Sequence, residues 1–334
     1  MLLAQSLITM KRNQQAHTYC IALFALCAAL SAATPAAAGV KADFQYMLSD
    51  FSGTIPSQWA RLDVDQRFRE IYTFNRGDRQ VQIFNENGME IFTFELQDNA
   101  GSVADMTVGE DGSIYLLSNR AGAASIMTLD YRGEPEGRIE LSGLPPAMET
   151  FNTDCLVYRN NSFYLVDSAS LRILVVSREG EFKKLHRLGV QLQDMAAEQD
   201  RERKKTQGLE MGGFAVDDQG TIYFTVPVLF AAFRLEQAGV LESFGRSGSG
   251  PGKFGVVAGI AGDGHGNIYV SDRLRSVVMV FDHNFEFLGE FGHRGNGEEN
   301  LIVPDDIAVD GEAGRLYVAQ AANRGVSVFR LVFQ

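Results

Sequence analysis

Six copies of one short pattern run through this chain of 334 residues and constrain its fold more than any other feature. Each copy has an apolar run, an Asp- or Gly-containing turn, a strand centred on an apolar residue and a tyrosine, a polar loop and a second alternating strand. The six central pairs are Ile71-Tyr72, Ile114-Tyr115, Phe163-Tyr164, Ile222-Tyr223, Ile268-Tyr269 and Leu316-Tyr317. Their tyrosines follow one another at intervals of 43 to 59 residues, and self-similarity of this period predicts a repeat architecture.

The segments within each copy read as β-strands. Val, Ile, Phe and Tyr alternate with polar residues, as in Val326-Ser327-Val328-Phe329, and Asp/Gly turns separate the runs. Four strands in about 45 residues make one propeller blade. The last copy has only three strands, and Asp43–Phe51 precedes the first copy as a lone strand. We therefore predict an all-β fold: a six-bladed β-propeller of four-stranded blades, with the ring closed by this N-terminal strand.

The last two copies are the most regular. They contain GIAGDGHGNIYVSDR and DDIAVDGEAGRLYVA, which resemble NHL repeats, and the resemblance extends more loosely from about Ala60 to Leu331. It implies a six-bladed propeller. It does not imply one activity, because related propellers serve as protein-binding or RNA-binding modules, as sensors and as a few enzymes.

The N-terminus has the pattern of a secretory signal. Lys11-Arg12 precedes the apolar run Tyr19–Ala33, and an Ala-x-Ala end follows. We predict a signal peptide at residues 1–38, cleaved near Ala38, and a single propeller at residues 39–334. The apolar run of about 15 residues is short for a bilayer span. The mature protein is thus expected to be secreted or periplasmic, without a membrane span, whether translation starts at Met1 or Met10.

Charge and cysteine content exclude some classes of function. Lys and Arg number 30 against 42 Asp and Glu, a net charge of −12, which argues against nucleic-acid binding. Cys155 is the one cysteine outside the predicted signal, so we expect a buried thiol and no internal disulfide. A chain of this size has enough core for one ring-shaped domain, which we expect to be monomeric.

Arginines gather in the loops of one predicted face. In a propeller, loops joining strand two to strand three, and one blade to the next, emerge on the same side, here called the top face. Their arginines, the arginine belt, are Arg76, Arg79, Arg120, Arg172, Arg273, Arg275, Arg324 and Arg294. The fourth copy has an apolar loop ending at Phe230 instead. Arginine suits planar anions and interfaces, so the belt and Phe230 form a candidate binding surface. The alternative is structural, with these arginines bonding loop carbonyls or the aspartates that end strand two.

Three carboxylates precede the first strand of their blades, where strands line the axis. Asp105, Asp154 and Asp306 occupy this position, and Gly213 and Gly259 occupy it in the fourth and fifth copies. Three oxygen ligands near an axis could hold Ca²⁺, as in propellers of the sugar-lactonase type. The alternative is that each aspartate caps nearby backbone N–H groups. We predict no cofactor, with calcium as the one candidate.

The histidines and one insertion complete the sequence pattern. The histidines fall in different strands and loops, so a shared zinc site is not expected. Residues 191–208 lengthen the junction between the third and fourth copies, and Asp194 and Ala196–Lys205 favour a helix with little apolar surface. This insertion is either a solvated extension or a docking element beside blade four.

The sequence thus favours a non-catalytic binding platform whose top face meets a protein or peptide partner in the cell envelope. The alternative is a metal-dependent hydrolase or lyase of the sugar-lactonase type, with Asp105, Asp154 and Asp306 in the channel. A sensor or glycan-binding module is a third candidate.

Overall fold

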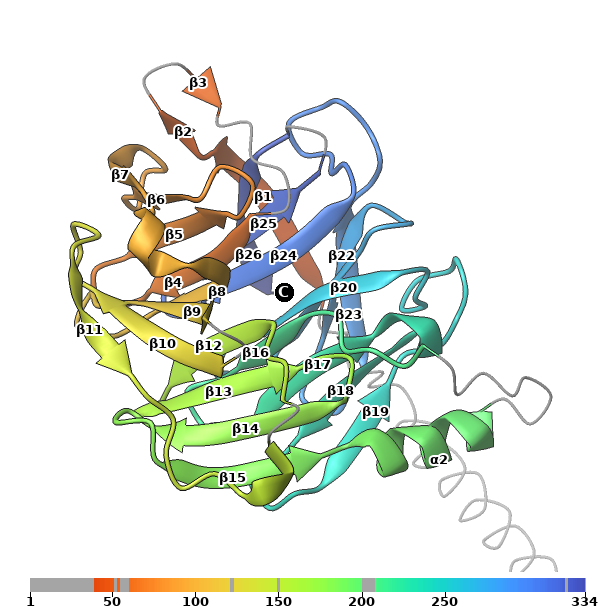
Figure 1. Cartoon of the computed structure of the whole chain (residues 1–334). Helices are drawn as coiled ribbons and strands as arrows, with labels where there is room; N and C mark the ends of the chain where they lie inside the picture. The colour runs from red at the N-terminus through yellow and green to blue at the C-terminus, as the bar shows by residue number, and fades with distance from the viewer. Residues whose placement is uncertain are drawn as a thin grey trace, which may run out of the picture. The chain divides into compact units, whose positions relative to one another are not determined.

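The structure is a computed structural model that describes residues 39–50, 53–54, 60–120, 123–148, 151–199, 208–321 and 324–333. The predicted signal peptide lies outside these residues. Val40–Gln334 form one compact unit. Six four-stranded antiparallel sheets surround a common axis (Figure 1). The chain is therefore a six-bladed β-propeller, as predicted from the repeats.

The first three blades follow one another along the chain, each running from its inner strand outward. They comprise β4 (Arg61–Asp65), β5 (Glu70–Asn75), β6 (Gln80–Phe84) and β7 (Glu90–Glu95); β8 (Ser102–Val108), β9 (Ile114–Arg120), β10 (Ala123–Leu129) and β11 (Pro135–Ile139); and β12 (Cys155–Arg159), β13 (Ser162–Asp167), β14 (Arg172–Ser177) and β15 (Phe182–Arg187). Short 3₁₀ turns, η1 (Asp98–Ala100) and η2 (Pro146–Met148), lie at the blade junctions.

The last three blades repeat this order. They comprise β16 (Phe214–Val216), β17 (Ile222–Val226), β18 (Ala231–Leu235) and β19 (Leu241–Phe244); β20 (Val257–Gly262), β21 (Ile268–Asp272), β22 (Val277–Phe281) and β23 (Phe287–Gly292); and β24 (Pro304–Asp310), β25 (Arg315–Gln320), β26 (Val326–Phe333) and β1 (Val40–Met47). The turn η3 (Pro227–Leu229) follows β17, and β2 (Ser49–Asp50) pairs with β3 (Gly53–Thr54). The first strands of successive blades contact one another around the ring, so they line the axis.

Closure of the ring depends on β1. This strand pairs antiparallel with β26, with Val40 opposite Phe333 and Phe44 opposite Phe329. The rings of Phe44 and Phe329 meet edge to face, with 5.9 Å between their centroids. The closing strand predicted from the sequence is present, but it begins at Val40 and ends at Met47, a little earlier than Asp43–Phe51.

The repeated tyrosines are buried, and in blades four and five their hydroxyls bond the aspartate of the preceding turn. The hydroxyl of Tyr223 donates to Oδ2 of Asp217 over 3.1 Å, and Tyr269 donates to Oδ2 of Asp263 over 2.9 Å. The other oxygen of Asp217 accepts a backbone N–H within the same turn, from Thr221, over 2.8 Å. One carboxylate thus fixes the turn and satisfies a tyrosine that would otherwise bury an unpaired hydroxyl.

One α-helix is present among the described residues, at the junction between blades three and four. The helix α2 (Gly189–Gln199) begins ahead of Asp194, and Leu192 is fully buried in the core between these blades. The expectation that this insertion has no deeply buried face was therefore wrong. Residues 200–207 lie outside the described residues. No helix in the described part of the chain is long and apolar enough to span a membrane.

Candidate functional site

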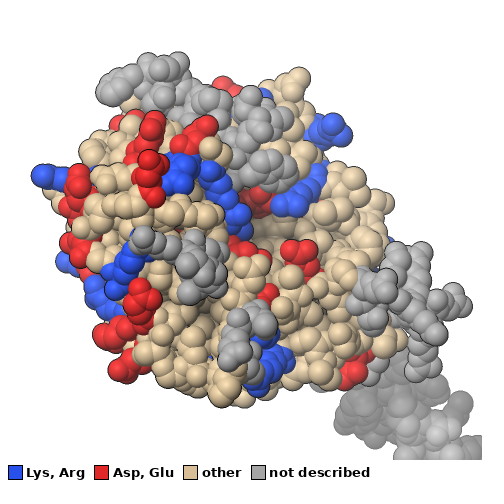
Figure 2. Space-filling model, in the orientation of Figure 1, with Lys and Arg blue, Asp and Glu red and all other residues tan. Residues whose placement is uncertain are grey.

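A cavity of about 600 Å³ opens on the top face at the propeller axis. We call it the top-face cavity. Its lining comes from blades one, four, five and six: Arg61, Asn75, Arg76, Gly77, Asp78, Gly212, Gly213, Pro227, Val257, Ala258, Gly259, Arg273, Asp305 and Asp306. Figure 2 shows a central hollow on this face with both basic and acidic side chains around it.

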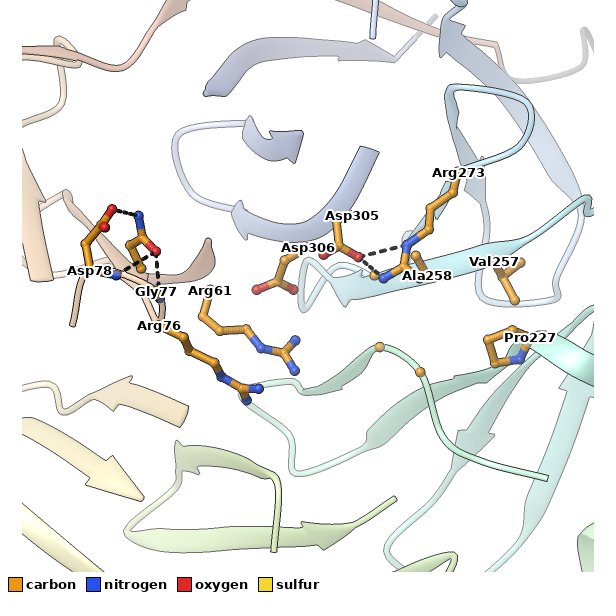
Figure 3. A pocket seen from close by; sticks show the side chains of 14 residues that line it. Arg61, Arg76, Gly77, Asp78, Pro227, Val257, Ala258, Arg273, Asp305 and Asp306 are labelled. Carbon is orange, nitrogen blue, oxygen red and sulfur yellow. Dashed lines mark hydrogen bonds and ion pairs between the residues drawn. The ribbon is translucent and has the colours of Figure 1, made fainter. Parts of the chain in front are cut away.

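Arg61 is the first residue of β4 and projects into the cavity (Figure 3). Its Nε lies 3.6 Å from Oδ1 of Asp105, and 30% of its side chain remains exposed. Burial by itself lowers the pKa of Arg61, but the carboxylates of Asp105 and Asp306 outweigh this effect and raise it. Arg61 is therefore a permanent cation at the channel mouth.

Asp105 and Asp306 tie neighbouring blades together. Oδ2 of Asp105 accepts the backbone N–H of Leu156 over 2.9 Å, and Oδ2 of Asp306 accepts that of Leu62 over 2.9 Å. Each bond joins the inner strands of two successive blades. Both aspartates thus have the backbone-capping role that the sequence offered as the alternative to metal binding.

The protonation of Asp306 differs from that of an exposed carboxyl. Burial raises the pKa of Asp306 to about 7, against the opposing effects of the Arg61 charge and the Leu62 N–H. Negative charge on Asp305 and Asp105 adds to the increase. Asp306 therefore changes its charge near neutral pH, in the wall of the cavity.

Asp154 is bound within its own blade. Its Oδ1 accepts the hydroxyl of Ser168 over 2.8 Å, and burial raises the pKa of the Asp154 carboxyl despite this bond. Across the described part of the chain, no three His, Cys, Asp or Glu side chains are grouped so that they could share a metal ion. The calcium site built from Asp105, Asp154 and Asp306 stays a prediction. Cys155 is buried beside this region, and burial raises the pKa of its thiol.

The arginine belt divides into two groups. Arg76 and Arg273 line the top-face cavity. One Nη of Arg76 donates to the carbonyl of Asp154 over 3.2 Å, and Nε of Arg273 lies 3.0 Å from Oδ1 of Asp305. Arg273 keeps 39% of its side chain exposed. Together with Arg61, these two belt residues give the cavity three cations, which Asp78, Asp305 and Asp306 of the same lining balance.

The other belt arginines mostly hold the loops. Arg79 donates to the carbonyls of Gly101 and Gln97. Arg172 pairs with Asp167 at 2.6 Å, and Arg275 bonds the carbonyl of Lys253 and the Glu290 carboxylate. Arg324 donates to the carbonyl of Gly297.

Among the described side chains, the remaining members of the predicted surface do not line the cavity. Arg294 is exposed, and the Arg120 side chain lies outside the described residues. Phe230 has a left-handed backbone, with φ of 53°, and packs against the core between blades four and five. Arg79, Arg172, Arg275 and Arg324 thus make the loop contacts that the structural alternative expected, and partner binding by the belt stays a prediction.

Sequence reasoning missed Arg61 and Asp305, although a signal for Arg61 exists. Aligned on their first strands, the blades read RLDVD, DMTVG, DCLVY, GFAVD, GIAGD and DIAVD. Arg61 therefore occupies the position filled by aspartate in three blades and glycine in two. One residue of opposite charge in an otherwise Asp/Gly position marks the site.

Comparison with solved structures shows similarity in fold. A protein of unknown function from Bacteroides thetaiotaomicron superposes with a TM-score of 0.61 at 12% identity, covering 88% of this chain and 76% of that one. A gluconolactonase from Xanthomonas campestris gives 0.55 at 16% identity, covering 83% and 88%. A catalytically inactive virginiamycin B lyase from Staphylococcus aureus, with quinupristin, gives 0.51 at 12%, covering 84% of each chain. No family model and no curated protein matches the sequence. At these identities the similarities establish the six-bladed propeller fold.

Proposed function

We propose that this protein is an exported propeller of the NHL-repeat type that acts as a non-catalytic binding platform for a protein or peptide partner. The top-face cavity carries this proposal. Arg61, Arg76 and Arg273 converge there in a protein of net charge −12. Arginine is a frequent hot-spot residue in interfaces because it offers several donors and a planar apolar surface.

An apolar contact lies beside these charges. Leu274 follows Arg273 in the loop between β21 and β22, and 69% of its surface is exposed. An exposed leucine next to the arginines of the cavity provides apolar area for a partner whose acidic group binds those arginines. The predicted signal peptide supports a partner in the cell envelope.

The metal-dependent enzyme remains the alternative, and two of the similar structures are named as a gluconolactonase and a lyase. That reading needs Asp105, Asp154 and Asp306 to share a cation. Arg61 already places positive charge beside Asp105, and Asp154 is engaged by Ser168. The contacts of these residues therefore favour binding over metal-dependent hydrolysis.

Selection of partners from a displayed library of envelope peptides tests the platform. The selected peptide is then titrated against the parent, Arg273→Ala combined with Leu274→Ala, and Arg178→Ala. Arg178 is a matched control, because it forms an exposed pair with Asp111 in a turn of the opposite face. We expect at least tenfold weaker binding by the double variant and no change in the control. Equal affinity for all three proteins would overturn the top-face assignment.

A further inference from the structure

The Arg61 and Arg76 side chains share one direction and one cavity. Figure 3 shows both guanidinium groups pointing into the top-face cavity from blade one, Arg61 from β4 and Arg76 from the turn after β5. Asp105 compensates the charge of Arg61 on one side, but Arg76 forms no ion pair among the described residues, so an anionic group between the two guanidiniums would supply the missing negative charge. The pair therefore favours an anionic ligand.

Most donors of this pair are available. A guanidinium has five N–H donors. With partners among the described residues, Arg61 has one ion pair, from Nε to Asp105, and Arg76 has one hydrogen bond, to the Asp154 carbonyl. Arg79, by contrast, donates hydrogen bonds to the carbonyls of Gly101 and Gln97. Arg61 and Arg76 thus keep more N–H donors for a ligand than the arginines that hold the loops.

The rest of the cavity restricts the charge of the ligand. Asp78, Asp305 and Asp306 also line it, and Arg273 is already paired with Asp305. A multiply charged anion such as a polyphosphate would place its outer charges against these carboxylates. A group with a single negative charge satisfies both guanidiniums with less repulsion, and planar carboxylate geometry matches the guanidinium fork.

The apolar part of the lining lies away from the arginines of blade one. Pro227 is partly exposed there, Val257 and Ala258 are almost fully buried, and Gly212 and Gly213 add no side chains. A ligand bound by its carboxylate at the arginines would place an adjoining apolar group against this part of the lining. The cavity can therefore bind the carboxylate of a ligand at its arginines and an adjoining apolar group of the ligand near Pro227.

We propose that Arg61 and Arg76 form a carboxylate-binding subsite, which takes the C-terminal carboxylate of a peptide partner whose last side chain is apolar. This inference rests on the proposed function, because it names the group by which the platform recognises its partner. A C-terminus offers this combination of one planar charge and a neighbouring side chain in one short segment.

The probe for this subsite is a pair of dipeptides that differ in one group, N-acetyl-Ala-Leu with a free carboxylate and the same dipeptide as its amide. Ligand-observed NMR titration of the full protein gives both affinities. We expect the carboxylate form to bind at least tenfold more tightly than the amide. Equal binding of the two forms, or no binding of either, would overturn the subsite.

Variants locate the binding. Arg76→Gln should reduce the affinity for the carboxylate dipeptide at least tenfold, and because Arg76 is exposed its fold should survive. Arg61→Lys, which keeps the charge but loses the fork, should weaken binding several-fold. Arg178→Gln on the opposite face is the control and should bind like the parent. Unchanged affinity in Arg76→Gln would contradict the proposal, as would inorganic phosphate displacing the dipeptide at lower concentration than acetate does.

The two proposals fail in different ways. If the library-selected partner loses affinity for the variant changed at Arg273 and Leu274 but binds Arg76→Gln normally, the platform stands and the subsite falls. If the selected partner binds all variants equally while the dipeptide still depends on Arg76, the top-face platform falls and a small-molecule carboxylate site remains.

Discussion

The blades are joined to their neighbours in two ways at the repeat position of Arg61. Blades one, two and six, here called the charged side, have a charged residue at this position, and blades four and five, the glycine side, have glycine. On the charged side, Asp105 and Asp306 accept backbone N–H groups from the next blade. On the glycine side, hydroxyls from the second strand take over: Thr225 donates to the carbonyl of Ala258 over 2.7 Å, and Ser271 donates to that of Asp305 over 2.6 Å. These hydroxyls also accept the N–H groups of Gly213 and Gly259.

The difference shows how a repeat fold gains a site without losing its ring. Blades four and five use small residues and close backbone packing, which contribute little charge. Blades one, two and six use ionised side chains, whose charges partly face the cavity. A ring joined wholly as in blades four and five would be as closed, but it would lack the charged side chains of Arg61, Asp105 and Asp306 at the mouth of the channel. The predictions below test this division between the two sides.

The largest effect is expected on the glycine side. A Cβ at Gly213 would overlap the carbonyl oxygen of Ala258, and one at Gly259 would overlap that of Asp305. Since backbone atoms cannot move away as a side-chain end can, Gly213→Ala should lower the free energy of unfolding by about 3 kcal/mol. Urea denaturation measures this. Gly137→Ala, where a Cβ meets nothing within 4 Å, is the control, and equal stability of the two variants would refute close blade packing.

A smaller loss is expected on the charged side. Asp105→Ala removes the acceptor of the Leu156 N–H and the partner of Arg61. Leaving a buried donor unpaired should reduce the free energy of unfolding by about 2 kcal/mol. Asp43→Ala, which removes only an exposed pair with Lys41, serves as the comparison. A loss no larger than in that control would show that Asp105 does not fasten the blades.

The hydroxyl contacts should contribute less than the carboxylate. Thr225→Val keeps the shape of the side chain and removes its hydrogen bonds, while the N–H of Gly213 still bonds the carbonyl of Ala258 over 2.9 Å. We expect a loss of about 1 kcal/mol in the free energy of unfolding. If Thr225→Val costs more than Asp105→Ala, the ranking of the two sides is reversed.

The smallest effect is a dependence on pH. Because the pKa of Asp306 is raised to about 7 in the folded protein, its favourable contribution is complete below the ordinary aspartate pKa of about 4 and is lost as pH rises through 7. The parent should therefore lose more stability between pH 5 and 8 than Asp306→Asn, by on the order of 1 kcal/mol, because Asp306 is only partly buried and solvent screens its charge. Thermal melts across this range measure the difference. Parallel curves for the two proteins would mean that Asp306 titrates at its ordinary pKa.

Much of the fold follows from the sequence because its signals are local and repeated. In blades four and five one turn aspartate serves both the turn and the tyrosine, as Asp263 does with Asn267 and Tyr269. The last copy has only three strands in the sequence pattern, and this indicated that the fourth strand comes from the N-terminal segment. Buried Leu192 was not foreseen, because the mixed charges of residues 198–205 outweighed the four-residue spacing of Leu188, Leu192 and Ala196, all three of which are buried.

The site was less accessible to sequence reasoning. Belt arginines such as Arg76 and Arg79 share one loop, yet one reaches the cavity and the other bonds carbonyls. Their roles depend on side-chain direction, which composition does not encode. Arg61 belongs to a strand rather than a loop, so a search for charged loops passed over it.

The pairing of β1 with β26 also affects the order in which the blades can form. Synthesis makes β1 first among the blade strands and β26 last, so the earliest strand must wait, unpaired, for its partner. The five blades between them are each complete in one continuous stretch of chain and have what they need to form beforehand. The sixth is assembled from both ends, which makes its completion the event that turns an open arc into a ring.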